Sequence, residues 1–167
     1  ISKDTSEFAC DSLRAWWKNQ GILDYPMARR LLILCDGGGS NSSRSHLFKQ
    51  DLQVLADEIG LEIRIAHYPP YCSKYNPIEH RMFPHVTRSC QGVIFETYDQ
   101  AQNYIEKTRT RKGLSVNAII LKKEYERGRE MDSNILKTLN IKHDDDLKLW
   151  NYRISPRNLN KYVNPVI

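Results

Sequence analysis

Two short apolar runs, each preceded by a segment with helical periodicity, constrain the fold of this chain more than any other feature. Residues 31–35 (LLILC) are apolar at every position, which predicts a central strand buried on both faces. Residues 61–67 predict a second buried strand. The order helix, strand, helix, strand favours an α/β fold with parallel neighbouring strands. The apolar helical positions are Ala9, Leu13, Trp16 and Trp17 before the first strand and Phe48, Leu52, Leu55 and Ile59 before the second.

Capping signals mark the ends of these two helices. The sequence Asp-Thr-Ser-Glu at residues 4–7 resembles a capping box, in which a short polar side chain accepts an unpaired backbone N–H and the glutamate bonds back. Gly21 predicts the end of the first helix, and Gly60 predicts the end of the second at the position that follows a helix.

The second half of the chain is less regular. A proline-rich loop leads to a helix that we expect to begin at Asn76 and Pro77, because both residue types are favoured at helix starts. Pro84 should kink or interrupt this helix. Beyond it, the sequence predicts helices over residues 98–108 and 133–139, an apolar strand over residues 116–121 and an extended segment over residues 149–154.

The composition narrows the class of protein. The chain has 167 residues, and its 25 lysines and arginines against 20 aspartates and glutamates give a net charge of +5. This basic excess is compatible with a polyanionic partner. No apolar run approaches the ~20 residues that cross a bilayer. The four cysteines show no paired spacing, which predicts reduced thiols in an intracellular protein.

Asp36 is the first candidate for chemistry. It follows the first predicted strand and precedes a glycine-rich stretch, residues 37–43. Ligands of open α/β sheets gather just beyond the carboxyl ends of strands, so a carboxylate here could face a metal ion or a substrate. An equally simple interpretation is that Asp36 caps a glycine-rich turn. A phosphate-binding loop is a weaker possibility, because the glycines match no known phosphate-binding pattern.

Glu79 is the second candidate. It falls in the first turn of the helix predicted from Asn76, where a glutamate often completes a capping box, and that is its structural alternative. A helix start also favours the ionised carboxylate, which is the form that a hard divalent cation binds. The predicted topology can bring Asp36 and Glu79 to one pair of metal ions, which would activate a hydroxyl group against a phosphodiester.

The segments around these two acids resemble a known family. Residues 32–41 (LILCDGGGSN) and 67–83 (HYPPYCSKYNPIEHRMF) are similar to the DDE transposases of the ISAzo-thirteen insertion-sequence group, and the second segment also resembles the Asn-Pro-Ile-Glu signature of mariner-like transposases. The resemblance runs from residue 4 to about residue 156. It implies an RNase H-like (retroviral-integrase-like) α/β fold, with Asp36 and Glu79 as the second and third members of a D-D-E triad.

The resemblance also implies cofactors, partners and a location. It implies cleavage and strand transfer of insertion-sequence DNA with Mg²⁺ or Mn²⁺, a homo-oligomer in a synaptic complex, and a cytoplasmic, nucleoid-associated protein. On this basis residues 1–112 are expected to form a partial RNase H-like catalytic domain, and residues 113–167 a C-terminal appendage of the same domain.

The chain departs from the family pattern at the first triad aspartate, which lies on an upstream strand in the family. Asp4, Asp11 and Asp24 do not match that position. We therefore expect this chain to lack the first strands of the sheet and to be inactive in transposition by itself, since metal-dependent phosphoryl transfer depends on such a carboxylate. A sheet without those strands would expose a hydrogen-bonding edge, which predicts self-association.

Basic residues suggest where DNA would bind. A cluster in residues 107–112 and a single arginine beside the glycine-rich loop could contact phosphates. A solvated basic helix end is the simpler interpretation for Lys107 and Arg109. The candidate DNA-binding residues are Arg44, Lys107, Arg109, Arg111 and Lys112.

Two other functions remain open. One is a non-catalytic DNA-binding module or an inactive transposase remnant, in which Asp36 and Glu79 would bind no metal. The other is a nucleotide-binding α/β protein, which would bind its ligand at residues 37–43.

Overall fold

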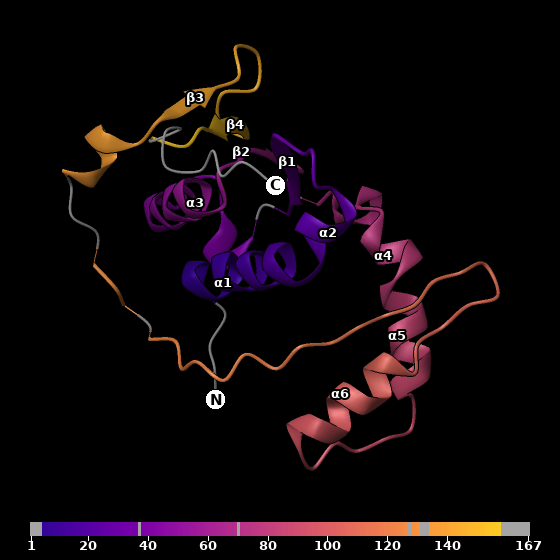
Figure 1. Ribbon diagram of the computed structural model, residues 1–167. Coiled ribbons are helices and arrows are strands. Elements are labelled where there is room, and N and C mark those ends of the chain that lie inside the picture. Colours follow the sequence, from indigo (N-terminus) through magenta and orange to yellow (C-terminus); the bar gives the residue numbers. More distant parts are fainter. Residues whose placement is uncertain (1–4, 37, 70, 127, 131–133, 158–167) are drawn as a thin grey trace. The chain divides into compact units, whose positions relative to one another are not determined.

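The computed structural model describes residues 5–36, 38–69, 71–126, 128–130 and 134–157 as a mixed α/β protein. The chain divides into two compact units (Figure 1). Unit 1 comprises Ile1–Pro70 and Glu124–Ile167, and unit 2 comprises Tyr71–Lys123. The predicted division into residues 1–112 and a C-terminal appendage, residues 113–167, stays a prediction.

A four-stranded mixed sheet forms the centre of unit 1, in the order β1-β2-β4-β3. The strands are β1 (Arg30–Cys35), β2 (Glu62–His67), β3 (Ile141–His143) and β4 (Asn151–Ile154). β1 and β2 are parallel, as their connection through a helix predicts, whereas β4 is antiparallel to both β2 and β3.

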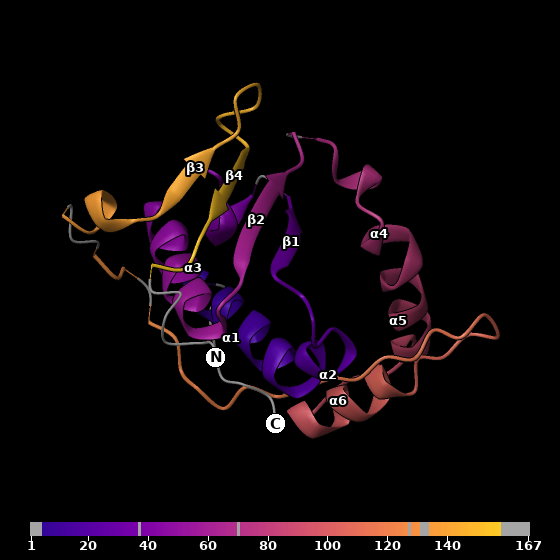
Figure 2. The same cartoon turned by 45° about the horizontal axis from the view of Figure 1, so that its top comes forward.

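Two helices cover one face of this sheet, α1 (Ser6–Trp16) and α3 (His46–Ile59) (Figure 2). Their apolar faces and the inward side chains of the strands form the core. The other face carries no helix or strand of unit 1 among the residues described, and an open hollow of about 520 Å³ lies along it. The fully buried side chains of the core include Phe48, Leu52, Leu55, Ile63, Ile65 and Ile154.

The prediction that residues 31–35 are buried on both faces is wrong. Leu32 is 59% exposed and Leu34 is 44% exposed, whereas Cys35 is buried. Side chains alternate across a strand, and helices cover only one face of this sheet, so every second side chain of β1 points to the open face. β1 is also the first strand in the sheet order, not a central one.

The first helix begins as predicted but ends later. The Thr5 hydroxyl accepts a hydrogen bond from the backbone N–H of Phe8 at 3.1 Å. Gly21 does not end the helix, which continues through a π-helical turn, η1 (Trp17–Gly21), into α2 (Ile22–Asp24). A Cβ at Gly21 would lie 2.5 Å from Cε3 of Trp17, so packing of the indole ring explains this glycine. Gly60 ends α3 in the left-handed conformation, as predicted.

Unit 2 contains three short α-helices after the 3₁₀ turn η3 (Ser73–Tyr75). The predicted interruption before Pro84 is confirmed, because the helix breaks at Met82. The predicted helix over residues 98–108 is also confirmed, although it ends two residues earlier, at Glu106. The α-helices are α4 (Ile78–Arg81), α5 (Phe83–Cys90) and α6 (Tyr98–Glu106).

The later segments differ more from expectation. Residues 116–121 form no strand, so that prediction is wrong, and the short strand β3 was not expected. A 3₁₀ helix, η4 (Ile135–Thr138), occupies most of the predicted helix 133–139, of which Ser133 lies outside the described residues. β4 falls within the predicted extended segment 149–154.

The four cysteines are free thiols, with Cys10 and Cys35 buried. Among the described residues, we find no helix with both the length and the apolar character that crossing a membrane requires.

Candidate active site

Asp36 immediately follows β1, at the carboxyl end of the parallel β1–β2 pair. Its neighbour in the chain, Cys35, lies opposite His67 of β2. The Asp36 side chain is exposed, and among the described residues it has no hydrogen bond or ion pair. Burial, and secondly the charge of Asp36, raise the pKa of the Cys35 thiol to about 11. The position of Asp36 directly after β1 confirms the prediction that it lies at a strand end.

The glycine-rich segment after Asp36 leads into the 3₁₀ helix η2 (Gly39–Asn41). Gly39 adopts a φ of +62°, which glycine reaches without strain. The backbone N–H of Ser42 then bonds the carbonyl oxygen of Gly39 at 3.3 Å. Gly37 lies outside the described residues.

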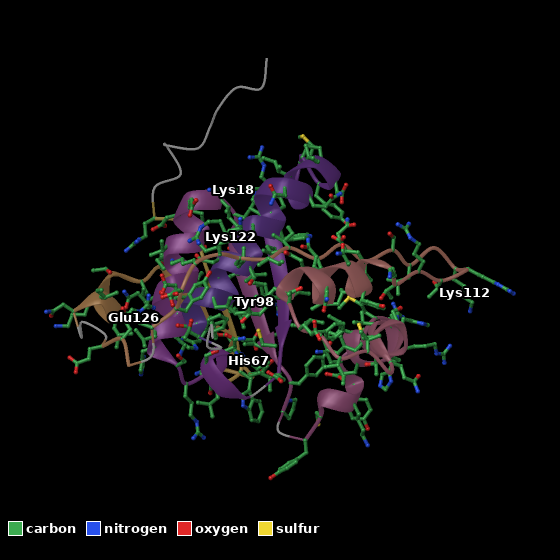
Figure 3. The ribbon with its side chains drawn as sticks, turned by 90° about the horizontal axis from the view of Figure 1, so that it is seen from below. Lys18, His67, Tyr98, Lys112, Lys122 and Glu126 are labelled. Atoms are coloured by element: carbon green, nitrogen blue, oxygen red, sulfur yellow. The ribbon has the colours of Figure 1, made fainter. Side chains whose placement is uncertain are left out.

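His67, labelled in Figure 3, fastens this segment to the rest of unit 1. Its Nε2 lies 2.8 Å from the carbonyl oxygen of Asn41, and its Nδ1 lies 2.9 Å from the carbonyl oxygen of Trp150. The ring is buried. His67 thus links the end of β2 to the loop after Asp36 and to the residue before β4.

Glu79 is the second residue of α4 in unit 2. α4 begins at Ile78 with Pro77 at its N-cap, one residue later than the sequence predicts, and the Asn76 side chain accepts a hydrogen bond from the backbone N–H of Ile78 at 3.4 Å. The Glu79 carboxylate is exposed and makes no hydrogen bond or ion pair with any described residue. It therefore does not return the reciprocal bond of a capping box, which was the structural alternative for this residue.

Asp36 and Glu79 belong to different units, and each is described here within its own unit. No group of three or more histidine, cysteine, aspartate or glutamate side chains in the described part of the chain could hold a metal ion. A joint metal site of Asp36 and Glu79 therefore stays a prediction. Their donor chemistry fits one, because both present unpaired carboxylate oxygens, the ligands that Mg²⁺ and Mn²⁺ prefer.

Most of the predicted DNA-binding residues lie on one tight turn of unit 2. The backbone N–H of Thr110 donates to the carbonyl oxygen of Leu114 at 3.0 Å, and Arg109 and Ser115 form an isolated antiparallel bridge. This turn exposes Arg109, Arg111 and Lys112, and Lys112 extends from its tip (Figure 3). We call residues 109–115 the basic turn.

The remaining predicted cations are placed differently. Lys107 follows α6, and its ammonium lies over the Tyr104 ring at 4.0 Å from the ring centre. Arg44 is exposed in unit 1, in the segment 42–45 that connects η2 to α3. Arg44 thus belongs to unit 1, whereas the basic turn belongs to unit 2.

Comparison with known proteins identifies the family. A family model described as the Rhodopirellula transposase DDE domain matches residues 1–156. The chain belongs to this family of DDE transposase domains. The resemblance inferred from residues 32–41 and 67–83 is therefore confirmed. Neither the curated proteins nor the solved structures include a match to the chain.

The other acids considered in this transposase domain have local partners. Asp11 pairs with Arg14 and accepts a hydrogen bond from the Tyr125 hydroxyl at 3.0 Å. Asp24 accepts a hydrogen bond from the Gln20 side chain at 2.8 Å. Asp4 lies outside the described residues. Asp11 and Asp24 therefore contrast with Asp36 and Glu79, whose carboxylates are unpaired within the described part.

Sequence reasoning missed the role of His67 in this region. The partners of its ring, Asn41 and Trp150, are distant from it in the sequence. The proline-rich segment that begins at His67 was the available signal, since a strand end next to such a loop is a place where a side chain commonly fixes the backbone.

Proposed function

We propose that this transposase domain cleaves and joins insertion-sequence DNA with the help of divalent metal ions, Mg²⁺ or Mn²⁺, held in part by Asp36 and Glu79. The observation that carries the proposal is the exposed Asp36 carboxylate, unpaired among the described residues, at the carboxyl end of the parallel β1–β2 pair. A parallel pair joined through α3 is also compatible with an RNase H-like fold, which we propose for the intact catalytic domain.

The chain's own residues would keep these carboxylates in position. His67 ties the loop after Asp36 to β2 and to Trp150, so the backbone that follows the acid is held at two points. Asn76 and Pro77 fix the turn that carries Glu79. Bound ions would supply charge neutralisation for the phosphodiester and activation of the attacking hydroxyl.

The basic turn would bind the DNA backbone. Its exposed Arg109, Arg111 and Lys112 can approach phosphate oxygens without a neighbouring element in the way, because they project from a turn. Such contacts position a duplex but carry no sequence information. The basic turn therefore serves affinity, and recognition of the transposon ends requires other contacts.

Metal binding tests the proposal directly. We would titrate the protein with Mn²⁺ and follow the free ion by electron paramagnetic resonance, comparing the wild type with Asp36→Ala and Glu79→Ala. The matched controls are Asp145→Ala, an exposed carboxylate of unit 1, and Glu96→Ala, an exposed carboxylate of unit 2. Each site variant should weaken Mn²⁺ binding by at least about tenfold, as loss of one charged ligand does, while both controls retain wild-type affinity.

Equal Mn²⁺ affinity in the site variants and the controls would overturn the metal site. Circular dichroism spectra would first establish that every variant keeps the wild-type fold.

A non-catalytic DNA-binding module is the second candidate, and the concentration of positive charge in unit 2 favours it. DNA binding alone does not separate the two functions, because removing an acid should leave DNA affinity equal or higher in both cases. The Mn²⁺ titration does separate them, since only the catalytic function requires the ion to bind at Asp36 and Glu79.

A further inference from the structure

The helical turn that carries Glu79 has little packing to hold it. α4 contains four residues, none of them buried, and the helix breaks at Met82 before α5 begins. A single helical turn is unstable by itself, because one backbone hydrogen bond does not offset the ordering of the residues that it spans. Hydrogen bonds of nearby side chains therefore matter more for this turn than burial does.

One such hydrogen bond comes from His80, the neighbour of Glu79. Its Nε2 lies 2.5 Å from the carbonyl oxygen of Lys74, in the middle of the 3₁₀ turn η3. A carbonyl oxygen only accepts, so Nε2 carries the hydrogen and donates it. This bond closes residues 74–80 into a loop that contains Asn76 and Pro77.

The other hydrogen bonds inside this loop are shorter in sequence range. The Asn76 side chain accepts from the backbone N–H of Ile78, and its carbonyl oxygen accepts from the backbone N–H of Glu79 at 3.1 Å. The His80 ring instead reaches back six residues. Among the described residues, His80 is the only one whose side chain forms a hydrogen bond between α4 and η3.

We propose that His80 is a positioning residue for Glu79, whose ring holds the turn in the conformation that presents the Glu79 carboxylate to a metal ion. The carboxylate is exposed, so its place depends on the backbone that carries it. The apparent affinity of a site falls in proportion to the fraction of molecules in which the binding conformation is formed. Loss of the bond from His80 to Lys74 lowers that fraction.

This proposal rests on the proposed function, because it gives His80 a role at the metal site of Glu79. It adds that the ring acts on the backbone and does not bind the ion. Two measurements keep the proposals apart, one without metal that tests the turn and one with Mn²⁺ that tests the site.

Amide hydrogen exchange in buffer without divalent ions tests the turn. The amides to follow are those of Arg81 and Met82, which donate to the carbonyl oxygens of residues 77 and 78 at 2.9 Å and 3.1 Å. In His80→Ala their protection factors should fall at least about twofold, as loss of one hydrogen bond predicts. Alanine favours helix more than histidine does, so a fall does not come from helix propensity.

Two further variants serve as controls for this measurement. His80→Gln should keep the wild-type protection factors, because its side-chain amide can donate to Lys74 in the same way. His85→Ala should also keep them, since no hydrogen bond of the His85 ring to a described residue is observed. Equal protection in the wild type and His80→Ala would overturn the proposal.

Titration with Mn²⁺ tests the consequence for the site. His80→Ala should weaken Mn²⁺ binding by about two- to tenfold, and His80→Gln should restore the wild-type affinity. Unchanged affinity in His80→Ala would overturn the positioning role. Absence of Mn²⁺ binding in the wild type would overturn the proposed function and with it the role of His80 at the site, whereas the exchange data would still show whether the bond holds the turn.

A spectroscopic measurement separates positioning from direct coordination. Imidazole is itself a common metal ligand, so loss of a ligand would also weaken binding in His80→Ala. Electron spin echo envelope modulation of the Mn²⁺-loaded protein detects a nitrogen atom bound to the ion. We expect the same spectrum for the wild type and His80→Gln. An imidazole nitrogen coupling that is present in the wild type and lost in His80→Gln would make His80 a ligand and overturn the positioning role.

Discussion

The two units of this transposase domain differ in how they use apolar residues. Unit 1 buries a cluster of apolar side chains between one face of the sheet and the helices α1 and α3, while others such as Met27 and Leu32 stay exposed. In the described part of unit 2, Thr108 is the single buried residue, and large side chains such as Tyr71, Ile94 and Tyr98 are exposed. Unit 1 therefore has a core of its own, and the apolar surface of unit 2 is available to something outside it.

The two units also differ in charge. Unit 2 has nine lysines and arginines against four aspartates and glutamates, a net charge of +5. Unit 1 has sixteen of each, a net charge of zero. The entire basic excess of the chain thus belongs to unit 2. From this comparison we propose a division of roles, in which unit 1 supplies stability and unit 2 supplies attraction to DNA.

The largest expected effect tests this division through stability. Ile63→Ala in β2 should lower the free energy of unfolding by about 2–5 kcal/mol, because it opens a cavity in the core. Ile63 has no exposed surface, whereas Ile94 in unit 2 is 89% exposed. Ile94→Ala should therefore change stability by less than about 0.5 kcal/mol. Chemical denaturation measures both, and similar losses would contradict the division.

The sequence predicted the helices and strands that form the core of unit 1 better than it predicted which of their side chains are exposed to solvent. The strands β1 and β2, their parallel pairing and the caps at Thr5 and Gly60 follow from local patterns, and the structure confirms them. Leu32 was placed inside because a run of apolar residues does not reveal whether a second layer of helices covers the strand. That information belongs to the packing of distant elements.

The candidate site was predicted to a similar extent. The positions of Asp36 after a strand and of Glu79 near a helix start could be anticipated from their motifs, whereas their role in a joint site stays a prediction. The bonds of His67 could not, because its partners lie 26 and 83 residues away in the sequence. The strand β3 was missed for a related reason, since its three residues form a strand only through pairing with β4.

A second prediction concerns the loop of unit 1 beside Asp36. His67→Phe keeps an aromatic ring of similar size but removes the hydrogen bonds to Asn41 and Trp150. The Asn41 carbonyl oxygen then loses this partner, whereas the Trp150 carbonyl oxygen keeps the backbone N–H of residue 67, so we expect a loss of about 1–3 kcal/mol in unfolding free energy. His85→Phe in unit 2 is the control, because no hydrogen bond of its ring to a described residue is observed. Equal losses in both variants would contradict the role of His67.

A third prediction concerns the charge of unit 2. Arg111→Ala combined with Lys112→Ala should weaken binding to duplex DNA regardless of sequence and lower the salt dependence of the logarithm of affinity by up to about 1.8, or ~0.9 for each phosphate contact. Lys142→Ala combined with Arg153→Ala removes the same charge from unit 1 and should leave the slope unchanged. Fluorescence anisotropy at a series of salt concentrations measures both.

A larger change of slope in the unit 1 variant than in the unit 2 variant would reverse the proposed roles. It would place the phosphate contacts on the open face of the sheet, where Lys142 and Arg153 lie on neighbouring strands.

The smallest expected effect concerns the balanced charges of unit 1. Burial tends to raise the pKa of Asp57, but its hydrogen bonds with Arg157 and Gln53 outweigh this and lower it below its ordinary value. A carboxyl group with a lowered pKa in the folded state contributes stability above its unfolded pKa, and this stability is lost as the pH falls through the folded value. The unfolding free energy should therefore decrease as the pH falls below about 4.

Arg157→Ala sharpens this prediction, because it removes the partner that lowers the pKa. The variant should be less stable than the wild type at pH 7 by no more than about 1 kcal/mol, since Arg157 is partly exposed and solvent screens the pair. The difference should shrink as the pH falls towards 3 and through the lowered pKa of Asp57, because its carboxyl group then becomes protonated in both proteins. Lys137→Ala, a change of the same charge on η4, should show no such convergence. A constant difference from pH 7 to pH 3 would mean that Arg157 stabilises unit 1 through packing of its side chain. The equal numbers of positive and negative residues in unit 1 would then not contribute to its stability.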